Sequence, residues 1–323
     1  MPAIKTERLA REFAGGITAV DGIDLEVAAG EIYGFLGPNG AGKTTTVRML
    51  TTLLLPTGGS ATVAGHDVAS EAPAVRRKIG VALQEAALDP LMTGRELIQL
   101  QATLHGLPRA RGRELGDALL QRVGLTLAAD RRVGTYSGGM RRRLDLAAAL
   151  VPSPEVLFLD EPTTGLDPVS RGAIWEEVEK LNSEGTTVFL TTQYLEEADQ
   201  LADRVGIISA GRLVAEGTPA ALKAEVGRPH LELSLADGEV DGEQCESILS
   251  RFGRPLPPRD GLHLVELERG ASEVGAVVRA LDEAGLAVES LDLVEPTLDD
   301  VFVAKTGQHL EGADEQADGE SPP

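Results

Sequence analysis

Residues 37–44 read Gly-Pro-Asn-Gly-Ala-Gly-Lys-Thr and match the consensus G-x-x-x-x-G-K-[ST] of the P-loop. A strand-like apolar stretch at residues 31–37 precedes the motif and a helix-like run at residues 44–54 follows it, which is the context that the motif requires. Glycines in such a loop let backbone N–H groups surround phosphate oxygens, and the following helix directs its positive end at the same place. A glycine-rich turn without a ligand is the structural alternative. The strand-loop-helix context favours binding of a nucleoside triphosphate, with Lys43 at the β- and γ-phosphates and the Thr44 hydroxyl on Mg²⁺.

Strand-like and helix-like stretches alternate over the first 225 or so residues, and this predicts an α/β domain with a mostly parallel sheet. The predicted strands lie at residues 31–37, 78–84, 155–161, 186–192 and 204–210. Residues 93–123 have no strand pattern and predict helices that break at residues 105–108. We therefore expect a helical insertion, about residues 93–150, within a sheet domain of residues 1–226.

A smaller unit begins where the pattern breaks, at residues 226–229. We expect a small C-terminal α/β sandwich domain at residues 227–306, which has no catalytic constellation and would regulate or assemble a dimer. Its predicted strands are residues 231–235, 262–268 and 286–294, and its predicted helices are residues 244–252 and 272–284. Residues 307–323 are acidic and end in two prolines, so we expect a disordered tail.

Composition narrows the choice of partners and compartment. The formal net charge is −21, which argues against a nucleic-acid partner and suits a membrane protein with basic cytoplasmic loops. A single cysteine, Cys245, excludes an intrachain disulfide framework and favours a reducing cytosol. No secretory signal opens the sequence, and no apolar run approaches the roughly 20 residues of a membrane helix. We therefore expect any membrane role to depend on a separate subunit.

Two acidic residues follow the predicted strand at residues 156–159. Asp160 can hold a metal ion through its water shell, and Glu161 is placed to activate an attacking water. A helix-capping pair of acids after a strand is the alternative, and the P-loop in the same chain makes the catalytic interpretation the better one.

A second anion-binding helix start is predicted at Ser137, Gly138 and Gly139, directly before a helical run. The γ-phosphate of one bound nucleotide is not expected to need two such sites from the same chain. Two chains arranged head to tail could each supply one. The three arginines that follow, Arg141 to Arg143, could bind nucleic acid, but on so acidic a chain a solvated or subunit-facing helix turn is the better expectation.

Residues 1 to about 226 resemble the ATP-binding cassette (ABC) proteins in the order of their motifs: P-loop, a glutamine after a strand, Ser-Gly-Gly, Leu-Phe-Leu-Asp-Glu-Pro and Gly-Leu-Asp. The signature differs from the commoner LSGGQ by Tyr136 and Met140 and keeps Ser-Gly-Gly. Residues 136–151, 157–168 and 191–204 closely resemble the ABC ATPases of the daunorubicin/doxorubicin-resistance type, as does Glu-Pro-Thr-Leu-Asp-Asp-Val-Phe at residues 295–302. This resemblance implies a P-loop NTPase cassette with a helical insertion, which binds and hydrolyses ATP with Mg²⁺.

The resemblance also implies roles for single residues. Phe13 stands where the family stacks an aromatic ring on adenine, although a buried core Phe is the alternative. Gln84 approaches Mg²⁺ and relays the nucleotide state to the permease, and Asp167 faces the partner chain. The residues implied to contact ATP are Phe13, Gly37, Pro38, Asn39, Gly40, Ala41, Gly42, Lys43, Thr44, Thr45, Gln84, Ser137, Gly138, Gly139 and Asp167; those implied at the metal are Thr44, Gln84 and Asp160.

Gln193 follows the predicted strand at residues 186–192, where most cassettes have a histidine that contacts the γ-phosphate. A glutamine amide can donate to phosphate but does not titrate near neutral pH. An ordinary polar strand end is the alternative. We expect Gln193, with Glu161, to be catalytic.

The function implied is that of the ATPase subunit of an ABC-2-like exporter, which dimerises on a separate permease at the cytoplasmic face of the membrane and drives export of a hydrophobic drug or antibiotic. Another ABC-2-like system, for lipid, polysaccharide or ion efflux, remains an alternative, and so does uptake, since the cassette motifs do not encode direction. A small-molecule kinase or GTPase has no use for Ser-Gly-Gly. Translation cassettes usually have two cassettes in one chain, and repair cassettes have a long coiled coil. A non-transport cassette is therefore the weaker alternative.

Overall fold

The computed structural model describes residues 1–84, 88–236, 242–259, 262–267 and 269–308. The chain divides into two compact units, Met1–Pro219 with Lys305–Pro323, and Ala220–Ala304. Most of the predicted tail, residues 309–323, lies outside the described residues.

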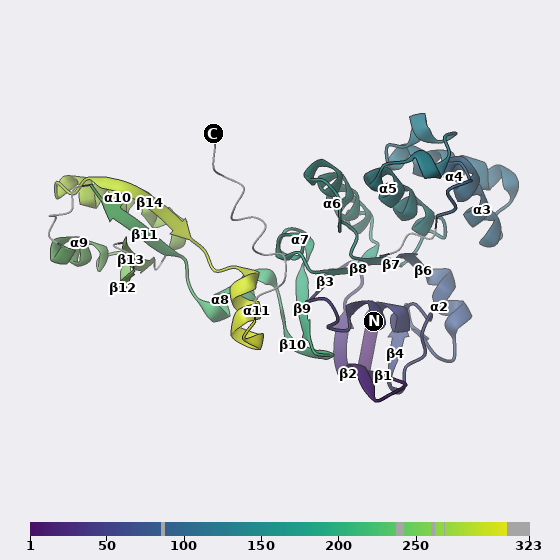
Figure 1. The fold of residues 1–323 in the computed structure, drawn as a ribbon, viewed down its shortest axis with the longest axis horizontal. Helices are drawn as coiled ribbons and strands as arrows, with labels where there is room; N and C mark the ends of the chain where they lie inside the picture. The colour runs from purple at the N-terminus through teal and green to yellow at the C-terminus, as the bar shows by residue number, and fades with distance from the viewer. Residues whose placement is uncertain (85–87, 237–241, 260–261, 268, 309–323) are drawn as a thin grey trace. The chain divides into compact units, whose positions relative to one another are not determined.

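A six-stranded sheet forms the centre of the first unit (Figure 1), with strand order β10-β9-β3-β8-β7-β6. Its strands are β3 (Ile32–Leu36), β6 (Ile79–Ala82), β7 (Val156–Asp160), β8 (Thr187–Thr192), β9 (Arg204–Ser209) and β10 (Arg212–Gly217). All neighbours pair in parallel except β10, which runs antiparallel to β9. The five predicted strands are confirmed. The carboxyl ends of β3, β7 and β8 meet at one edge, since Leu36 pairs with Thr192 and Asp160 with Thr191.

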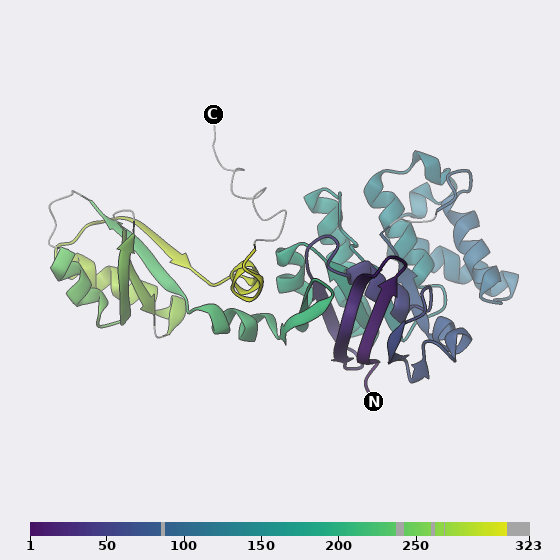
Figure 2. The same cartoon turned by 60° about the horizontal axis from the view of Figure 1, so that its bottom comes forward.

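A second, antiparallel sheet was not predicted. Its order is β2-β1-β4-β5, and Figure 2 shows β1 and β2 from the front, in purple. The strands are β1 (Ile4–Phe13), β2 (Ile17–Val27), β4 (Gly58–Val63) and β5 (His66–Asp67). Register shifts interrupt the β1–β2 ladder, and Arg8 has a positive φ of 49°. Such bulges break the alternation of buried and exposed residues by which a strand is recognised.

Seven α-helices accompany these sheets among the described residues 1–218. They are α1 (Lys43–Leu50), α2 (Ala72–Lys78), α3 (Gly94–Leu104), α4 (Arg109–Arg122), α5 (Gly138–Ala149), α6 (Pro168–Ser183) and α7 (Leu195–Leu201). The predicted helical insertion is confirmed in α3, α4 and α5. A capping box between Thr93 and Glu96 starts α3, and Pro108 precedes α4, so the predicted break is where one helix ends and the next begins.

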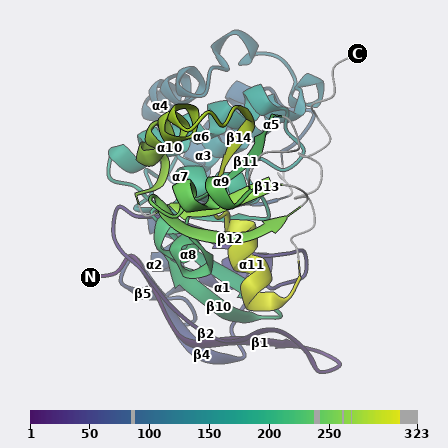
Figure 3. The same cartoon turned by 90° about the vertical axis from the view of Figure 1, so that its left-hand side faces the viewer.

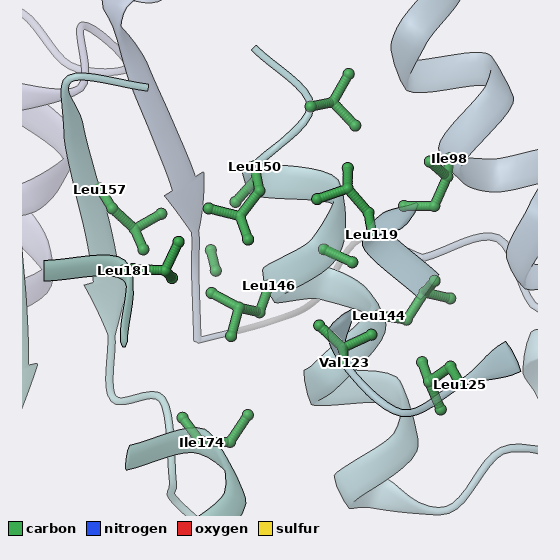
Figure 4. Packing of buried hydrophobic residues seen from close by; sticks show 14 of the residues in the cluster. Ile98, Leu119, Val123, Leu125, Leu144, Leu146, Leu150, Leu157, Ile174 and Leu181 are labelled. Atoms are coloured by element: carbon green, nitrogen blue, oxygen red, sulfur yellow. The ribbon is translucent and has the colours of Figure 1, made fainter. Parts of the chain in front are cut away.

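Two hydrophobic clusters hold the first unit together. One joins the helical insertion to the sheet: Leu146 and Leu150 of α5 belong to the same cluster as Leu157 of β7 and Leu181 of α6 (Figure 4). The other centres on Phe189 of β8, whose ring centroid lies 5.6 Å from that of Tyr33 and 5.7 Å from that of Phe158. These clusters fix α5 and the P-loop helix α1 against the same sheet.

The second unit has a four-stranded antiparallel sheet of order β12-β13-β11-β14 (Figure 3). Its strands are β11 (His230–Leu235), β12 (Gly253–Arg259), β13 (Leu262–Leu267) and β14 (Val288–Val294), and its helices are α9 (Gly242–Leu249), α10 (Val274–Glu283) and α11 (Leu298–Thr306); α8 (Pro219–Val226) lies at the division between the units. Side chains of α9 and α10 form one cluster with those of β11 and β13, as in a two-layer sandwich. Strand β12 was missed because Gly-Arg-Pro-Leu-Pro-Pro-Arg is rich in proline, which is tolerated only at an edge such as the one β12 occupies.

The division of the core predicts that residues 1–226 fold without the rest of the chain. The two clusters described above draw only on the first unit, and the cluster of the sandwich draws only on the second. Trp175, the single tryptophan of the chain, lies in α6 and reports on the first unit alone. In urea, the free energy of unfolding followed by Trp175 fluorescence should agree between the fragment and the full chain within about 1 kcal/mol.

The same fragment should bind ATP as the full chain does, and we expect it to dimerise less well. Loss of a cooperative Trp175 transition, or a folded fragment that does not bind ATP, would show that part of the site or of its core lies after residue 226.

Candidate active site

The P-loop joins β3 to α1 in a conformation that only glycine accommodates at two positions. Gly42 has a φ of 111°, and a Cβ there would lie 2.4 Å from the Ala19 carbonyl oxygen. A Cβ on Gly37 would lie 2.4 Å from the Ile208 carbonyl oxygen. The Gly37 N–H donates to the Thr192 carbonyl at 3.3 Å, which ties the start of the loop to the end of β8.

Lys43 lies under this loop with only 4% of its side chain exposed. Its ammonium donates to the Gly37 carbonyl at 2.6 Å and to the Pro38 carbonyl at 3.1 Å. It also lies 3.3 Å from a carboxylate oxygen of Glu161. Burial lowers the pKa of Lys43, and the carboxylates of Glu161 and Asp160 oppose that shift.

Asp160 ends β7 and is fully buried. Its Oδ1 accepts hydrogen bonds from the Thr44 hydroxyl at 3.2 Å and from the Thr191 hydroxyl at 2.6 Å. Its Oδ2 is buried and has no hydrogen-bond partner among the described residues. A buried carboxylate oxygen next to a threonine hydroxyl suits a hard divalent cation, so these residues fit Mg²⁺.

Glu161 follows Asp160 with a positive φ of 48°, a strained conformation for a residue with a side chain. Its N–H donates both to the carbonyl and to the hydroxyl oxygen of Thr191, each at 3.1 Å. Its Oε2 accepts from the Gln84 amide at 2.9 Å, and its Oε1 faces Lys43. The carboxylate is therefore held between the lysine and the glutamine.

A cavity of about 180 Å³ lies over the P-loop. Its lining residues are Ala19, Pro38, Asn39, Gly40, Gly42, Lys43, Thr44, Thr45, Gln84 and Glu161. Most of the residues predicted to contact ATP are thus brought to one place. Sequence reasoning missed Ala19 and Thr191. Thr191 lies at the end of a predicted strand, but nothing in the sequence pattern indicated its bonds to Asp160 and Glu161.

The Ser-Gly-Gly residues lie at the start of α5 and do not line that cavity. The Ser137 side chain caps the helix by accepting from the Met140 N–H, and both Ser137 and Gly138 are exposed. Gly138 lines a neighbouring cavity of about 290 Å³ that also has Gln84 and Glu161 in its wall. Gly139 is buried, and a Cβ there would lie 2.6 Å from the Ser170 hydroxyl oxygen.

Three other predicted residues lie outside the lining of the P-loop cavity. Asp167 caps α6 by accepting from the Ser170 N–H, and it is exposed. Phe13 ends β1 and is 38% exposed, with the Arg11 guanidinium 4.7 Å from its ring centroid. Gln193 is half-buried in the turn after β8. Its neighbour Thr192 accepts the hydrogen bond from Gly37 described above, so Gln193 follows a residue that contacts the P-loop.

Comparisons with known proteins agree with this geometry. Residues 20–164 match the family model for ABC transporters, and residues 217–306 match the model for the C-terminal domain of DrrA1-3-like ATP-binding proteins. The chain is 50% identical to the daunorubicin resistance ATP-binding protein DrrA3 of Streptomyces coeruleorubidus, over 91% of this chain and 92% of that protein. It is 49% identical to the daunorubicin/doxorubicin resistance ATP-binding protein DrrA of Streptomyces peucetius, over 94% of this chain and 92% of that protein.

Among solved structures, the fold matches a dimeric ATP-binding cassette in a post-hydrolysis state, bound to ADP and Pi. The TM-score is 0.62 and the identity 26%, over 67% of this chain and 98% of that one. Sequence likeness over both units, the cassette fold and the P-loop geometry agree. The chain belongs to the ABC transporter ATP-binding proteins, among those of the daunorubicin/doxorubicin-resistance type, and it is an ATPase.

Proposed function

We propose that this chain hydrolyses MgATP as one half of a head-to-tail dimer, and that the cycle drives a separately encoded permease that exports a hydrophobic drug or antibiotic. The observation that supports the hydrolytic site is the Glu161 carboxylate, held between Lys43 and Gln84 beside the P-loop. The substrate class rests on the relatives named above, whose names record resistance to daunorubicin and doxorubicin.

Each side chain at this edge has a task in hydrolysis. Lys43 would exchange its contact with Glu161 for the β- and γ-phosphates, which frees the carboxylate to accept a proton from the attacking water. Thr44, Asp160 and Gln84 would hold Mg²⁺, which neutralises charge that develops on the phosphates. The Thr191 hydroxyl and the backbone bonds of Glu161 keep the two acids in place.

The dimer is proposed because the chain holds two phosphate-binding helix starts in different places. The exposed Ser137 and Gly138 begin a helix of 12 residues but do not line the P-loop cavity. A partner chain could bring its own Ser-Gly-Gly over the γ-phosphate, with Asp167 facing it across the interface. The solved relative described above is a dimer. The exposed ring of Phe13 would stack on adenine from the side of β1.

Association with the membrane is proposed through the permease. No helix in the described part of the chain has the length and apolar character to cross a membrane. The net charge of −21 suits basic loops at the cytoplasmic face, where we place the protein as a peripheral subunit.

Glu161→Gln should stop turnover while ATP binding persists. The amide keeps the shape of the side chain and its bond with Gln84 but cannot accept the proton, which typically costs about 10²–10⁴-fold in kcat. Steady-state ATPase activity and ATP-dependent dimerisation, followed by light scattering, provide the measurement; we expect an ATP-stabilised dimer.

Glu155→Gln is the matched control, because Glu155 makes an exposed ion pair with Lys78 just before the same strand β7. It should hydrolyse ATP like the parent. Parent-like turnover by Glu161→Gln would remove Glu161 from its proposed role.

Gln193→Ala tests the second catalytic assignment. A hydrogen bond to a charged group is worth ~1.5–3 kcal/mol, so its loss in the transition state should lower kcat about ten- to a hundredfold. Gln193→His should keep much of the activity, since imidazole can also donate. The histidine variant should also gain pH dependence between about 5 and 8, where imidazole titrates and an amide does not.

The measurement is kcat for the three proteins across that pH range, with Gln200→Ala as an exposed control on the following helix α7. A Gln193→Ala chain as active as the parent would mean that Gln193 is only a polar strand end.

A further inference from the structure

The three arginines after Ser-Gly-Gly have different surroundings. Arg141 is exposed and donates to the Tyr136 carbonyl at 2.9 Å, at the start of its own helix. Arg143 is half-buried and donates to the Val123 carbonyl at 3.1 Å, within the helical insertion. Arg142 is 9% exposed. The expectation of a solvated or subunit-facing turn is therefore wrong for Arg142, which points inward.

Arg142 reaches out of the helical insertion to the sheet. Its guanidinium donates to the Asp160 carbonyl at 2.8 Å and to the Pro162 carbonyl at 2.8 Å, the residues on either side of Glu161. It also donates to the Leu83 carbonyl at 2.6 Å, directly before Gln84. The Arg142 side chain on α5 therefore holds the backbone next to both Gln84 and Glu161, whose side chains contact each other beside the P-loop.

Asp145, one turn further along α5, keeps the guanidinium in place. Its Oδ2 lies 3.2 Å from Arg142 Nη1, and both side chains are nearly buried. Burial raises the pKa of Asp145 to about 6, and Arg142 opposes that rise. A buried arginine with a carboxylate on one side and three carbonyls in front has its donors directed in a planar fork that lysine cannot reproduce.

Arg142 also lies close to the helix start that the proposed dimer needs. It lies four residues after Gly138, one turn from the exposed helix start that the proposed dimer turns toward the second ATP. The Arg142 guanidinium therefore links the backbone around Glu161 and Gln84 to the helix turn that begins at Ser137 and Gly138.

We propose that Arg142 is a positioning residue that couples the two halves of the nucleotide machinery within one chain. When the backbone of Gln84 and Glu161 moves, Arg142 moves the Ser-Gly-Gly end of α5 with it. Binding or hydrolysis of ATP at one site therefore affects the other site. This inference rests on the proposed function, in which each ATP lies between two chains.

The test uses three variants of the full-length chain and one control. Arg142→Gln removes most of the bonds to carbonyls but leaves Asp145 buried without its partner, so Arg142→Gln/Asp145→Asn removes that charge as well. Arg142→Lys keeps the charge with fewer donors. Arg143→Gln is the matched control, since it makes the same change one position along and its partner at Val123 lies within the helical insertion.

Four quantities are measured for each protein: the melting temperature, the Kd for ATP in EDTA, kcat, and the Hill coefficient of ATPase activity against ATP. Arg142→Gln/Asp145→Asn should keep the Kd for ATP within about threefold and lower kcat tenfold or more, a split that identifies loss at the reacting state rather than in binding. Its Hill coefficient should approach about 1, because binding of ATP at one site no longer changes the affinity of the other. Arg142→Lys should be intermediate, and Arg143→Gln should resemble the parent.

Two results would overturn the proposal. One is a folded double variant with the kcat and Hill coefficient of the parent. The other is a common fall in melting temperature, ATP affinity and kcat, the signature of a merely structural arginine. If the double variant does not fold, Arg142→Lys provides the test. An Arg142→Lys protein with the melting temperature, kcat and Hill coefficient of the parent would contradict the proposal.

Glu161→Gln measured alongside separates this proposal from the function on which it rests. If Glu161→Gln stops turnover while the Arg142 variants behave like the parent, the coupling alone is wrong. If Glu161→Gln turns over normally, the proposed site is wrong and the coupling falls with it.

Discussion

The parallel register between β3, β8 and β7 is the constraint on which the rest of the site depends. It sets Leu36 opposite Thr192 and Asp160 opposite Thr191, so that the P-loop, the acidic pair and the Gln193 turn all leave the sheet at one edge. Thr191 then fixes the details, because its hydroxyl bonds Asp160 while its backbone and hydroxyl receive the N–H of Glu161. A slip of one residue would turn every side chain of β8 to the other face of the sheet.

Lys43 and Glu161 form a buried ion pair within this edge. Lys43 and Glu161 are both nearly buried and lie 3.3 Å apart, so each reduces the cost of burying the other. A bound triphosphate would replace the Glu161 carboxylate as the partner of Lys43. Glu161 would then be free to accept a proton from the attacking water. The positive φ of Glu161 stores backbone strain at the residue assigned to proton transfer, held by the same Thr191 bonds. Arg142 adds hydrogen bonds to the backbone carbonyls of Asp160 and Pro162, the residues before and after Glu161.

Much of this arrangement follows from local pattern in the sequence. Buried parallel strands are apolar throughout, and the P-loop, the Asp160-Glu161 pair and Ser-Gly-Gly each have a short-range chemical reason, so the strands and most of the P-loop cavity could be predicted. The antiparallel sheet of β1, β2, β4 and β5 could not, because bulges near Arg8 break its alternation. Strand β12 is hidden by its prolines. The roles of Thr191 and Arg142 depend on partners 30 and 59 residues away in sequence, Glu161 and Leu83, which no local pattern encodes.

Mixing two inactive variants tests most directly whether each ATP is enclosed by the P-loop of one chain and the Ser-Gly-Gly of another. Lys43→Ala disables the P-loop. Gly138→Asp places a carboxylate where the phosphate would lie, and a Cβ there meets nothing closer than 3.9 Å, so the chain should fold. Each variant alone should be nearly inactive, because both sites of its dimer carry a lesion. With random pairing, half of the dimers in an equal mixture are mixed and have one intact site of two, so the mixture should recover activity that neither variant has alone, up to about a quarter of the parent ATPase activity. A mixture no more active than its components would contradict a site shared between two chains.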